Sequence, residues 1–130
     1  MARPASTHPT DLEMAILKIL WREGPSPVRC VRGELVGFRD LAHTSVLTIM
    51  NIMVEKGYLQ RVKQDNYFVY RPKITREATT RGMLRDMVQK AFDGSTVAAM
   101  VNLLESSDLD SESLKQLRTM INRKAKEQEP

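Results

Sequence analysis

The hydrophobic pattern of this chain changes its period at Gly57, and that change limits the possible folds more than any other feature. Three segments before Gly57 carry apolar residues at the i, i+3 and i+4 spacing of a helix face. Two short β-prone runs follow at 59–63 and 67–71, and the polar residues 64–66 between them are typical of a hairpin turn. Three helices and then a β-hairpin predict a mainly α-helical protein that begins with a winged helix-turn-helix.

Capping and turn residues predict where the first two helices begin. Thr10 and Glu13 have capping-box spacing, so we expect the first helix to start at Thr10 and to stop at Gly24-Pro25. Ser26 followed by Pro27 has the pattern of an N-cap and a first helical residue. The second helix is therefore expected to start at this pair.

The third segment starts near Thr44 and has the clearest apolar face of the chain. The apolar residues at helical spacing are Val46, Ile49, Met50, Met53 and Val54. When that face is turned inward, a polar face with Glu55 at its end points outward. Short hydroxyl and amide side chains near a helix N-terminus suit the reading of bases in the major groove, although a solvated polar face would look the same. The expected base-reading residues are Thr44, Ser45, Thr48 and Asn51.

The hairpin carries residues that can follow a phosphate backbone. Arg61, Lys63 and Arg71 are basic, and Tyr67 adds an aromatic hydroxyl. Exposed wing residues without a role would have the same composition, but the order of three helices and a hairpin favours DNA binding. The full set of expected backbone contacts is His43, Lys56, Arg61, Lys63, Tyr67 and Arg71.

Three more amphipathic helices are expected after the hairpin, at about 75–92, 95–106 and 110–126. They have few partners within the chain, and a second copy of the chain is the simplest surface that would bury them. The expected dimerisation residues are Leu84, Met87, Val88, Phe92, Val97, Met100, Val101, Leu104, Leu114, Leu117 and Ile121. The expected divisions are a loose arm at 1–9, a DNA-binding domain at 10–72, a helical dimerisation region at 73–126 and a charged tail at 127–130.

Catalysis, metal binding and membrane insertion are poorly supported by the sequence. His8 and His43 lack the spacing of a metal site or a catalytic triad, and no phosphate-binding loop is present. The single cysteine, Cys30, excludes an intrachain disulfide and a cysteine cluster, and we expect it to be a buried or half-buried structural residue. Trp21 is expected to belong to the core. We therefore expect a cytoplasmic protein that is not an enzyme and has no cofactor and no metal.

Residues 42–72, AHTSVLTIMNIMVEKGYLQRVKQDNYFVYRP, resemble the winged-helix segment of the penicillinase and methicillin-resistance repressors, the BlaI/MecI family. The run TDLEMAILKILWREGPSPV resembles the first helix of that family and the turn that follows it. The similarity extends over nearly the whole chain. The most specific pieces are Ser45-Val46, Thr48, Lys56-Gly57 and Tyr70-Arg71-Pro72.

The resemblance implies a homodimeric transcriptional repressor that binds an inverted-repeat operator in double-stranded DNA. In that family, a membrane-bound sensor with a cytoplasmic zinc protease domain leads to cleavage of the repressor in its dimerisation region. The cleaved bond of the family is typically Asn-Phe, and the matching place here is Asn102-Leu103, where the asparagine is kept and the aromatic residue is not.

The sequence departs from the family pattern in two places. The recognition helix of the family commonly carries basic residues, whereas residues 44–54 contain none and have the apolar Leu47 and Ile52 instead. Copper-responsive relatives end in a cysteine-rich metal site, and no cysteine follows Cys30, so that subgroup is not expected. The apolar residues and a net charge of only +4 leave one rival hypothesis, a winged-helix protein-interaction module without sequence-specific DNA binding.

Overall fold

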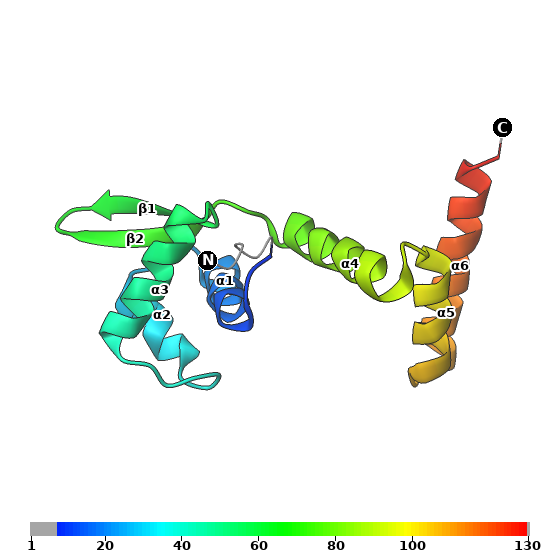
Figure 1. Ribbon diagram of the computed structural model, residues 1–130, viewed down its shortest axis with the longest axis horizontal. Coiled ribbons are helices and arrows are strands. Elements are labelled where there is room, and N and C mark those ends of the chain that lie inside the picture. The colour runs from blue at the N-terminus through cyan, green and yellow to red at the C-terminus, as the bar shows by residue number, and fades with distance from the viewer. Residues whose placement is uncertain (1–7, 130) are drawn as a thin grey trace. The chain divides into compact units, whose positions relative to one another are not determined.

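The computed structural model describes residues 8–129, which form six α-helices and one two-stranded sheet. Figure 1 shows their order along the chain. The predicted mainly α-helical fold with a hairpin after the third helix is confirmed. The chain divides between Leu84 and Arg85 into two compact units. The elements are α1 (Asp11–Glu23), α2 (Val28–Leu35), α3 (His43–Glu55), β1 (Leu59–Gln64), β2 (Tyr67–Pro72), α4 (Arg76–Phe92), α5 (Thr96–Ser106) and α6 (Ser111–Glu127).

The start of α1 follows the predicted capping box. The Thr10 hydroxyl oxygen accepts a hydrogen bond from the Glu13 backbone N–H at 3.2 Å, and the Glu13 carboxylate accepts one from the Thr10 N–H at 2.9 Å. These two bonds satisfy donors that a helix N-terminus otherwise leaves free. Gly24 ends the helix with a φ of 84°, a conformation that glycine adopts without strain.

The predicted N-cap of α2 is wrong. Pro27 is the N-cap, without a side-chain hydrogen bond, and Val28 is the first helical residue. Ser26 instead pairs with Tyr70 of β2: the Ser26 N–H donates to the Tyr70 carbonyl at 3.1 Å and the Tyr70 N–H donates to the Ser26 carbonyl at 2.9 Å. The extended backbone of Ser26 is used to hold the hairpin against the turn between α1 and α2.

The hairpin follows α3 directly and is one residue longer on each strand than expected. The strands are antiparallel, and Gln64 pairs with Tyr67, so the turn consists of Asp65 and Asn66 alone. Asp65 has a φ of 53°, which a short polar side chain tolerates better than most residues. The pairing of Gln64 with Tyr67 at the tip sets the strand register, and the register determines which face of the hairpin each side chain occupies.

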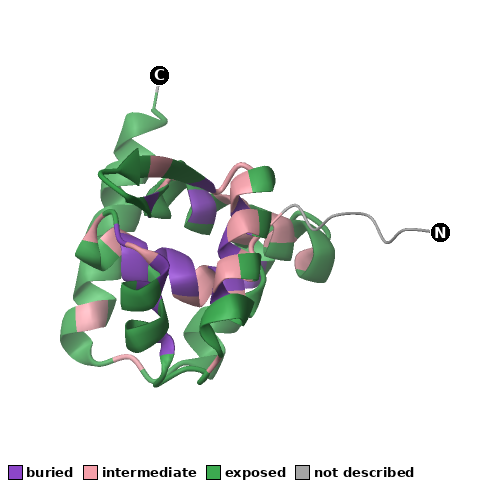
Figure 2. Ribbon diagram, turned by 90° about the vertical axis from the view of Figure 1, so that its left-hand side faces the viewer, coloured by how far each residue is buried: buried purple, intermediate pink, exposed green. Residues whose placement is uncertain are grey.

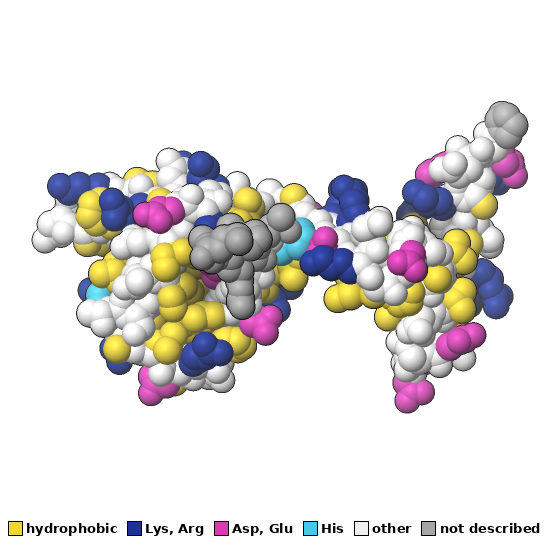
Figure 3. All heavy atoms as spheres, viewed as in Figure 1, with side chains coloured by type: hydrophobic (Ala, Val, Ile, Leu, Met, Phe, Trp, Pro, Cys, Tyr) yellow, Lys and Arg dark blue, Asp and Glu magenta, His cyan; other side chains and the backbone are white. Residues whose placement is uncertain are grey.

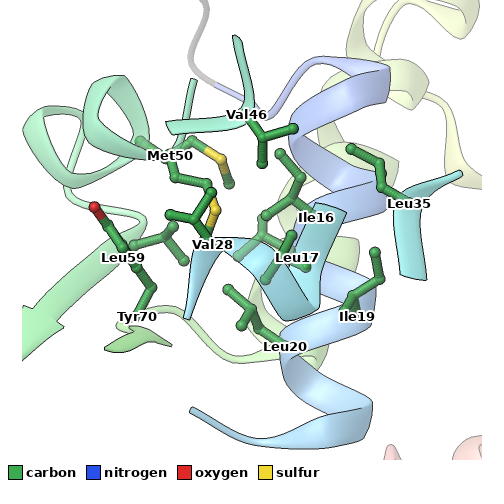
Figure 4. Close-up of a cluster of buried hydrophobic side chains, with 12 residues drawn as sticks. Ile16, Leu17, Ile19, Leu20, Val28, Leu35, Val46, Met50, Leu59 and Tyr70 are labelled. Atoms are coloured by element: carbon green, nitrogen blue, oxygen red, sulfur yellow. The ribbon is translucent and has the colours of Figure 1, made fainter. Parts of the chain in front are cut away.

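The core of the N-terminal unit lies where α1, α2, α3 and the hairpin meet (Figure 2). Figure 4 shows these side chains pointing toward one another from all four elements. Burial of each large apolar side chain stabilises the fold by about 1.5–3 kcal/mol. The predicted inward face of α3 is confirmed, with Val46, Met50 and Met53 fully buried and Ile49 and Val54 half-buried. The residues with at most 1% exposure are Ile16, Leu17, Leu20, Val31, Leu35, Val46, Met50, Met53, Leu59 and Tyr70.

The predictions for Trp21 and Cys30 had opposite outcomes. Trp21 packs against the core as expected, and its indole Nε1–H donates to the Ile74 carbonyl at 3.0 Å. Cys30 is exposed, so the prediction of a buried or half-buried structural residue is wrong. Because α2 turns Val28 and Val31 inward, Cys30 lies off the inward face and is exposed to solvent.

The helices that follow the hairpin begin and end within about one residue of their predicted bounds. Ser95 caps α5 by accepting from the Ala98 N–H at 3.1 Å, and Asp110 caps α6 by accepting from the Ser113 N–H at 2.8 Å. Hydrogen bonds from Ser113 lower the pKa of the Asp110 carboxyl below its ordinary value. Local sequence signals therefore determine these helices well.

The predicted terminal segments lie partly outside the described residues. Of the loose arm expected at 1–9, the structure describes His8 and Pro9. Of the charged tail expected at 127–130, Glu127 belongs to α6 and Pro130 is not described. Within the described part of the chain, no helix combines the length and the apolarity that crossing a membrane requires.

Candidate nucleic-acid interface

The first turns of α3 present an exposed polar surface. Thr44, Ser45 and Thr48 are all exposed, as expected for residues that read bases. The N-cap, Ala42, provides no side-chain hydrogen bond, so no side chain caps the first N–H groups of α3. The positive end of the helix dipole lies at the same place. This end of α3 is therefore open to an anionic partner and rich in hydroxyl groups.

Asn51 lies one turn further along α3 and has an internal partner. Its Oδ1 accepts a hydrogen bond of 2.8 Å from the Tyr70 hydroxyl, and Asn51 itself is half-buried. Base reading by Asn51 stays a prediction, and it would have to use the amide nitrogen. The sequence reasoning missed this bond because it joins residues 19 positions apart on different elements.

Two apolar residues flank the polar surface of α3. Leu47 is half-buried and packs against the core, whereas Ile52 has 42% of its surface exposed. An exposed isoleucine on this helix can contact the methyl group of thymine or an apolar partner. Leu47, in contrast, is used in packing.

The basic residues of the wing are divided between two faces of the hairpin. Cross-strand pairing sets Arg61 opposite Tyr70 and Lys63 opposite Phe68 on one face. Tyr67 and Arg71 pair with Gln64 and Gln60 on the other face, because successive side chains of a strand alternate. The wing therefore has a pair of cations on one side and an arginine with a tyrosine on the other, and contact of these residues with phosphates stays a prediction.

The wing arginines are oriented by their neighbours. The Arg61 guanidinium lies 4.6 Å from the centre of the Phe68 ring, and both Nε and Nη2 of Arg71 donate to the Gln60 Oε1, at 2.9 and 2.7 Å. Lys63 is exposed, and no ion pair of Lys63 occurs within the described residues. Lys and Arg side chains gather over the hairpin in Figure 3. These exposed cations can approach a phosphate backbone.

Lys56 has a different environment from the other expected backbone contacts. Its Nζ lies 2.8 Å from the Oε2 of Glu13, and Glu13 has 4% of its surface exposed. Lys56 is therefore exposed but paired with a buried carboxylate, between the end of α3 and the start of α1. Sequence reasoning assigned Glu13 to the capping box alone, and the residue performs both tasks.

A hollow of about 400 Å³ separates the tip of the wing from the starts of α2 and α3. His43, an expected backbone contact, lines it together with Tyr67 and Phe68. Arg29 lines the same hollow and is exposed. The sequence reasoning did not name Arg29, although a basic residue in the first turn of a helix-turn-helix element was a usable signal. Arg29 adds a cation to the hollow between α3 and the hairpin.

The residues expected to dimerise leave a large apolar surface on α4, α5 and α6, visible in Figure 3. Val88 and Phe92 are half-buried and the other nine are exposed, from 41% at Leu117 to 72% at Val97. Among the described residues beyond Leu84, Ala99 is the only buried hydrophobic residue. Asn102 and Leu103 both lie exposed within α5, and Leu103 has 60% of its surface accessible.

Comparison with known proteins gave a consistent result. The family profile described as penicillinase repressor matches residues 9–123. The chain is 34% identical to the transcriptional regulator BlaI of Mycobacterium tuberculosis (strain ATCC 25618 / H37Rv) over 102 residues, which is 77% of this chain and 74% of the relative. It is 23% identical over 112 residues to the penicillinase repressor of Bacillus licheniformis, which covers 86% of this chain and 88% of the relative. It is also 20% identical over 115 residues to the methicillin resistance regulatory protein MecI of Staphylococcus aureus (strain N315), covering 88% and 94%.

Proposed function

This chain belongs to the penicillinase repressor family, and we propose that it is a homodimeric transcriptional repressor of the antibiotic-resistance type that binds an inverted-repeat operator. The observation that carries the proposal is the exposed, hydroxyl-rich start of α3 beside the basic wing. In this arrangement α3 enters the major groove and the wing contacts the backbone.

The exposure of the described side chains supports two separate roles within the interface, base reading and backbone binding. Thr44, Ser45 and Thr48 are exposed on α3 and read bases. Backbone binding falls to exposed residues around them, while Lys56 is held by Glu13 and contributes to the fold instead. The residues that contact phosphates are Arg29, His43, Arg61, Lys63, Tyr67 and Arg71.

Dimerisation is supported by the apolar surface of the C-terminal helices. Side chains such as Met100 and Leu117, which are 56% and 41% exposed, each contribute about 1 kcal/mol when the rest of their surface is buried, roughly half of the value for burying a fully exposed side chain. A second copy of the chain carries the same surface, so a two-fold symmetric contact buries both at once. Two winged units joined in this way fit the two halves of an inverted repeat.

Repression would be relieved by a cut that removes part of this dimerisation surface. A cut at Asn102-Leu103 by a membrane-bound sensor protease would detach α6 and remove Leu114, Leu117 and Ile121 from the dimer. The bond lies inside a helix, so it is accepted only after local opening, and we expect slow cleavage of the intact dimer. Sequencing the fragments after incubation with the cognate protease tests this step, and loss of repression without a cut near Asn102 contradicts it.

DNA binding is tested by comparing a duplex selected by the protein from a random pool with an unselected duplex over a range of salt concentrations. Thr48→Ala should weaken binding to the selected duplex by about 1–3 kcal/mol and change the unselected one little. Lys63→Ala should weaken both and flatten the salt dependence. Equal affinity for every duplex, or no salt dependence, would instead favour the protein-interaction module that the exposed Ile52 suits.

A further inference from the structure

We propose that Asn51 and Tyr70 form a lock between the recognition helix and the wing, and that Asn51 acts in DNA recognition as a positioning residue. The inference rests on the proposed function, because it concerns how the two DNA-contacting elements are held together. Its geometric basis is the hydrogen bond of 2.8 Å from the Tyr70 hydroxyl to the Asn51 Oδ1. We call these two residues the helix–wing lock.

The Tyr70 side chain needs this bond because it is buried. Tyr70 has 1% of its surface exposed and belongs to the core cluster. A buried phenol group without a partner is costly, and the described residues contain no buried side-chain nitrogen or oxygen that lacks one. Asn51 supplies an acceptor for this hydroxyl from α3.

The backbone of Tyr70 is fixed independently of its hydroxyl. Ser26 pairs with it through two hydrogen bonds, and within the hairpin Tyr70 stands opposite Arg61. Tyr70 therefore connects the turn before α2, the base of the wing and, through Asn51, the recognition helix. The lock fixes the separation between the cations Arg61 and Lys63 and the hydroxyl groups at the start of α3.

The same bond limits what Asn51 can do at a base. Bidentate recognition of adenine by asparagine requires the amide oxygen as acceptor and the amide nitrogen as donor in one plane facing the base. The Oδ1 of Asn51 faces Tyr70 in a half-buried position. The bond therefore commits the amide oxygen of Asn51 to orienting α3 against the wing and leaves only the amide nitrogen to face a base.

The first test measures backbone amide exchange in the full-length protein without DNA. Tyr70→Phe keeps the ring and the pairing with Ser26 and removes only the hydroxyl. It should speed exchange of the wing amides at 60–69 by roughly five-fold, the effect of one net hydrogen bond, and leave α1 unchanged. Asn51→Ala should have the same effect, and Asn51→Asp, which retains an acceptor, should not. Tyr58→Phe removes a phenol elsewhere in the unit and is the matched control.

The second test measures affinity for the selected and unselected duplexes. Tyr70→Phe should weaken binding to the selected duplex several-fold although its ring is buried, and the double variant with Asn51→Ala should be no weaker than Asn51→Ala alone. Unchanged wing exchange in Tyr70→Phe overturns the lock, and fully additive losses overturn the positioning role. If the wild-type protein bound no duplex, the proposed function would fail, while the exchange measurement would still decide whether the lock exists.

Discussion

The two units of this chain treat their apolar residues in opposite ways. In the N-terminal unit, helices that cross one another bury whole side chains, and Ile16, Leu17 and Val46 have no exposed surface. In the C-terminal unit, α5 and α6 leave Val97, Leu103 and Ile121 more than half exposed. The helices of the C-terminal unit are no worse capped, since α5 and α6 both have side-chain N-caps whereas only α1 of the first three helices has one, so the difference lies in packing and not in helix formation.

This difference shows that local signals and burial are separate requirements. Ser95 and Asp110 determine where α5 and α6 begin, but helices of 11 and 17 residues are marginally stable in water without a packed face. The N-terminal unit satisfies both requirements within one chain. The C-terminal unit satisfies only the first, and we infer that its second requirement is met by another copy of the chain.

The largest expected effect comes from separating the units. A fragment ending at Leu84 should fold, remain monomeric and bind a selected duplex about 10²–10⁴-fold more weakly than the full chain, because the second half-site contact is no longer intramolecular. Sedimentation and binding curves measure both quantities. A dimeric fragment, or a full chain that is monomeric at micromolar concentration, contradicts the assignment of dimerisation to the C-terminal helices.

A leucine pair compares the two kinds of apolar residue directly. Leu20 is 1% exposed, and Leu20→Ala should lower the free energy of unfolding by about 2–5 kcal/mol because it leaves a cavity in the core. Leu117 is 41% exposed, and Leu117→Ala should leave the unfolding of the N-terminal unit unchanged and weaken the dimer instead. Trp21 is the only tryptophan, and its fluorescence reports on the N-terminal unit. Equal shifts of its transition in both variants would show that the two units unfold as one.

The features that the sequence predicted well are those that depend on neighbours along the chain. The capping box of Thr10 and Glu13 and the start of α6 at Asp110 need only three or four residues to form. Cys30 was misjudged because its burial was inferred from its residue type, whereas the helical spacing of Val28, Val31 and Leu35 gives the inward face of α2 and leaves Cys30 off it. The inward face of α3 was predicted correctly from five apolar positions.

The features that the sequence did not predict join distant residues. Lys56 reaches Glu13 across 43 positions, and the partner of Ser26 is Tyr70 on β2. The division of the wing cations depends on strand register, where a shift of one residue moves each side chain to the opposite face. Sequence reasoning therefore named residues of the candidate interface but not the contacts that orient them.

The partly buried ion pair of Glu13 and Lys56 supplies a test of intermediate size. Lys56→Met should destabilise the N-terminal unit by about 1–2 kcal/mol, less than a fully buried pair would, because only the Glu13 carboxylate is buried while Lys56 is exposed. The control is Lys90→Met in the C-terminal unit, where the partner Asp86 is one helical turn away and Lys90 is 75% exposed; it should cost about 0.5 kcal/mol or less. Urea unfolding monitored at Trp21 and by circular dichroism measures the two losses, and equal losses would remove the distinction between the units.

The smallest expected effect concerns the acid dependence of α6. Hydrogen bonds from Ser113 lower the pKa of Asp110 below 3.8 in the folded protein, so the ionised cap stabilises α6 above the ordinary pKa, and this stabilisation is lost as the pH falls through the lowered value. Asp110→Asn keeps a capping side chain that does not titrate, and it should remove a small part of the acid-induced loss of helix signal. Asp108→Asn, two residues earlier and outside the helix, should leave that loss unchanged. Because the cap is exposed and local, the effect should be the same in monomer and dimer; an acid dependence that varied with chain concentration would instead place its origin at the interface between copies.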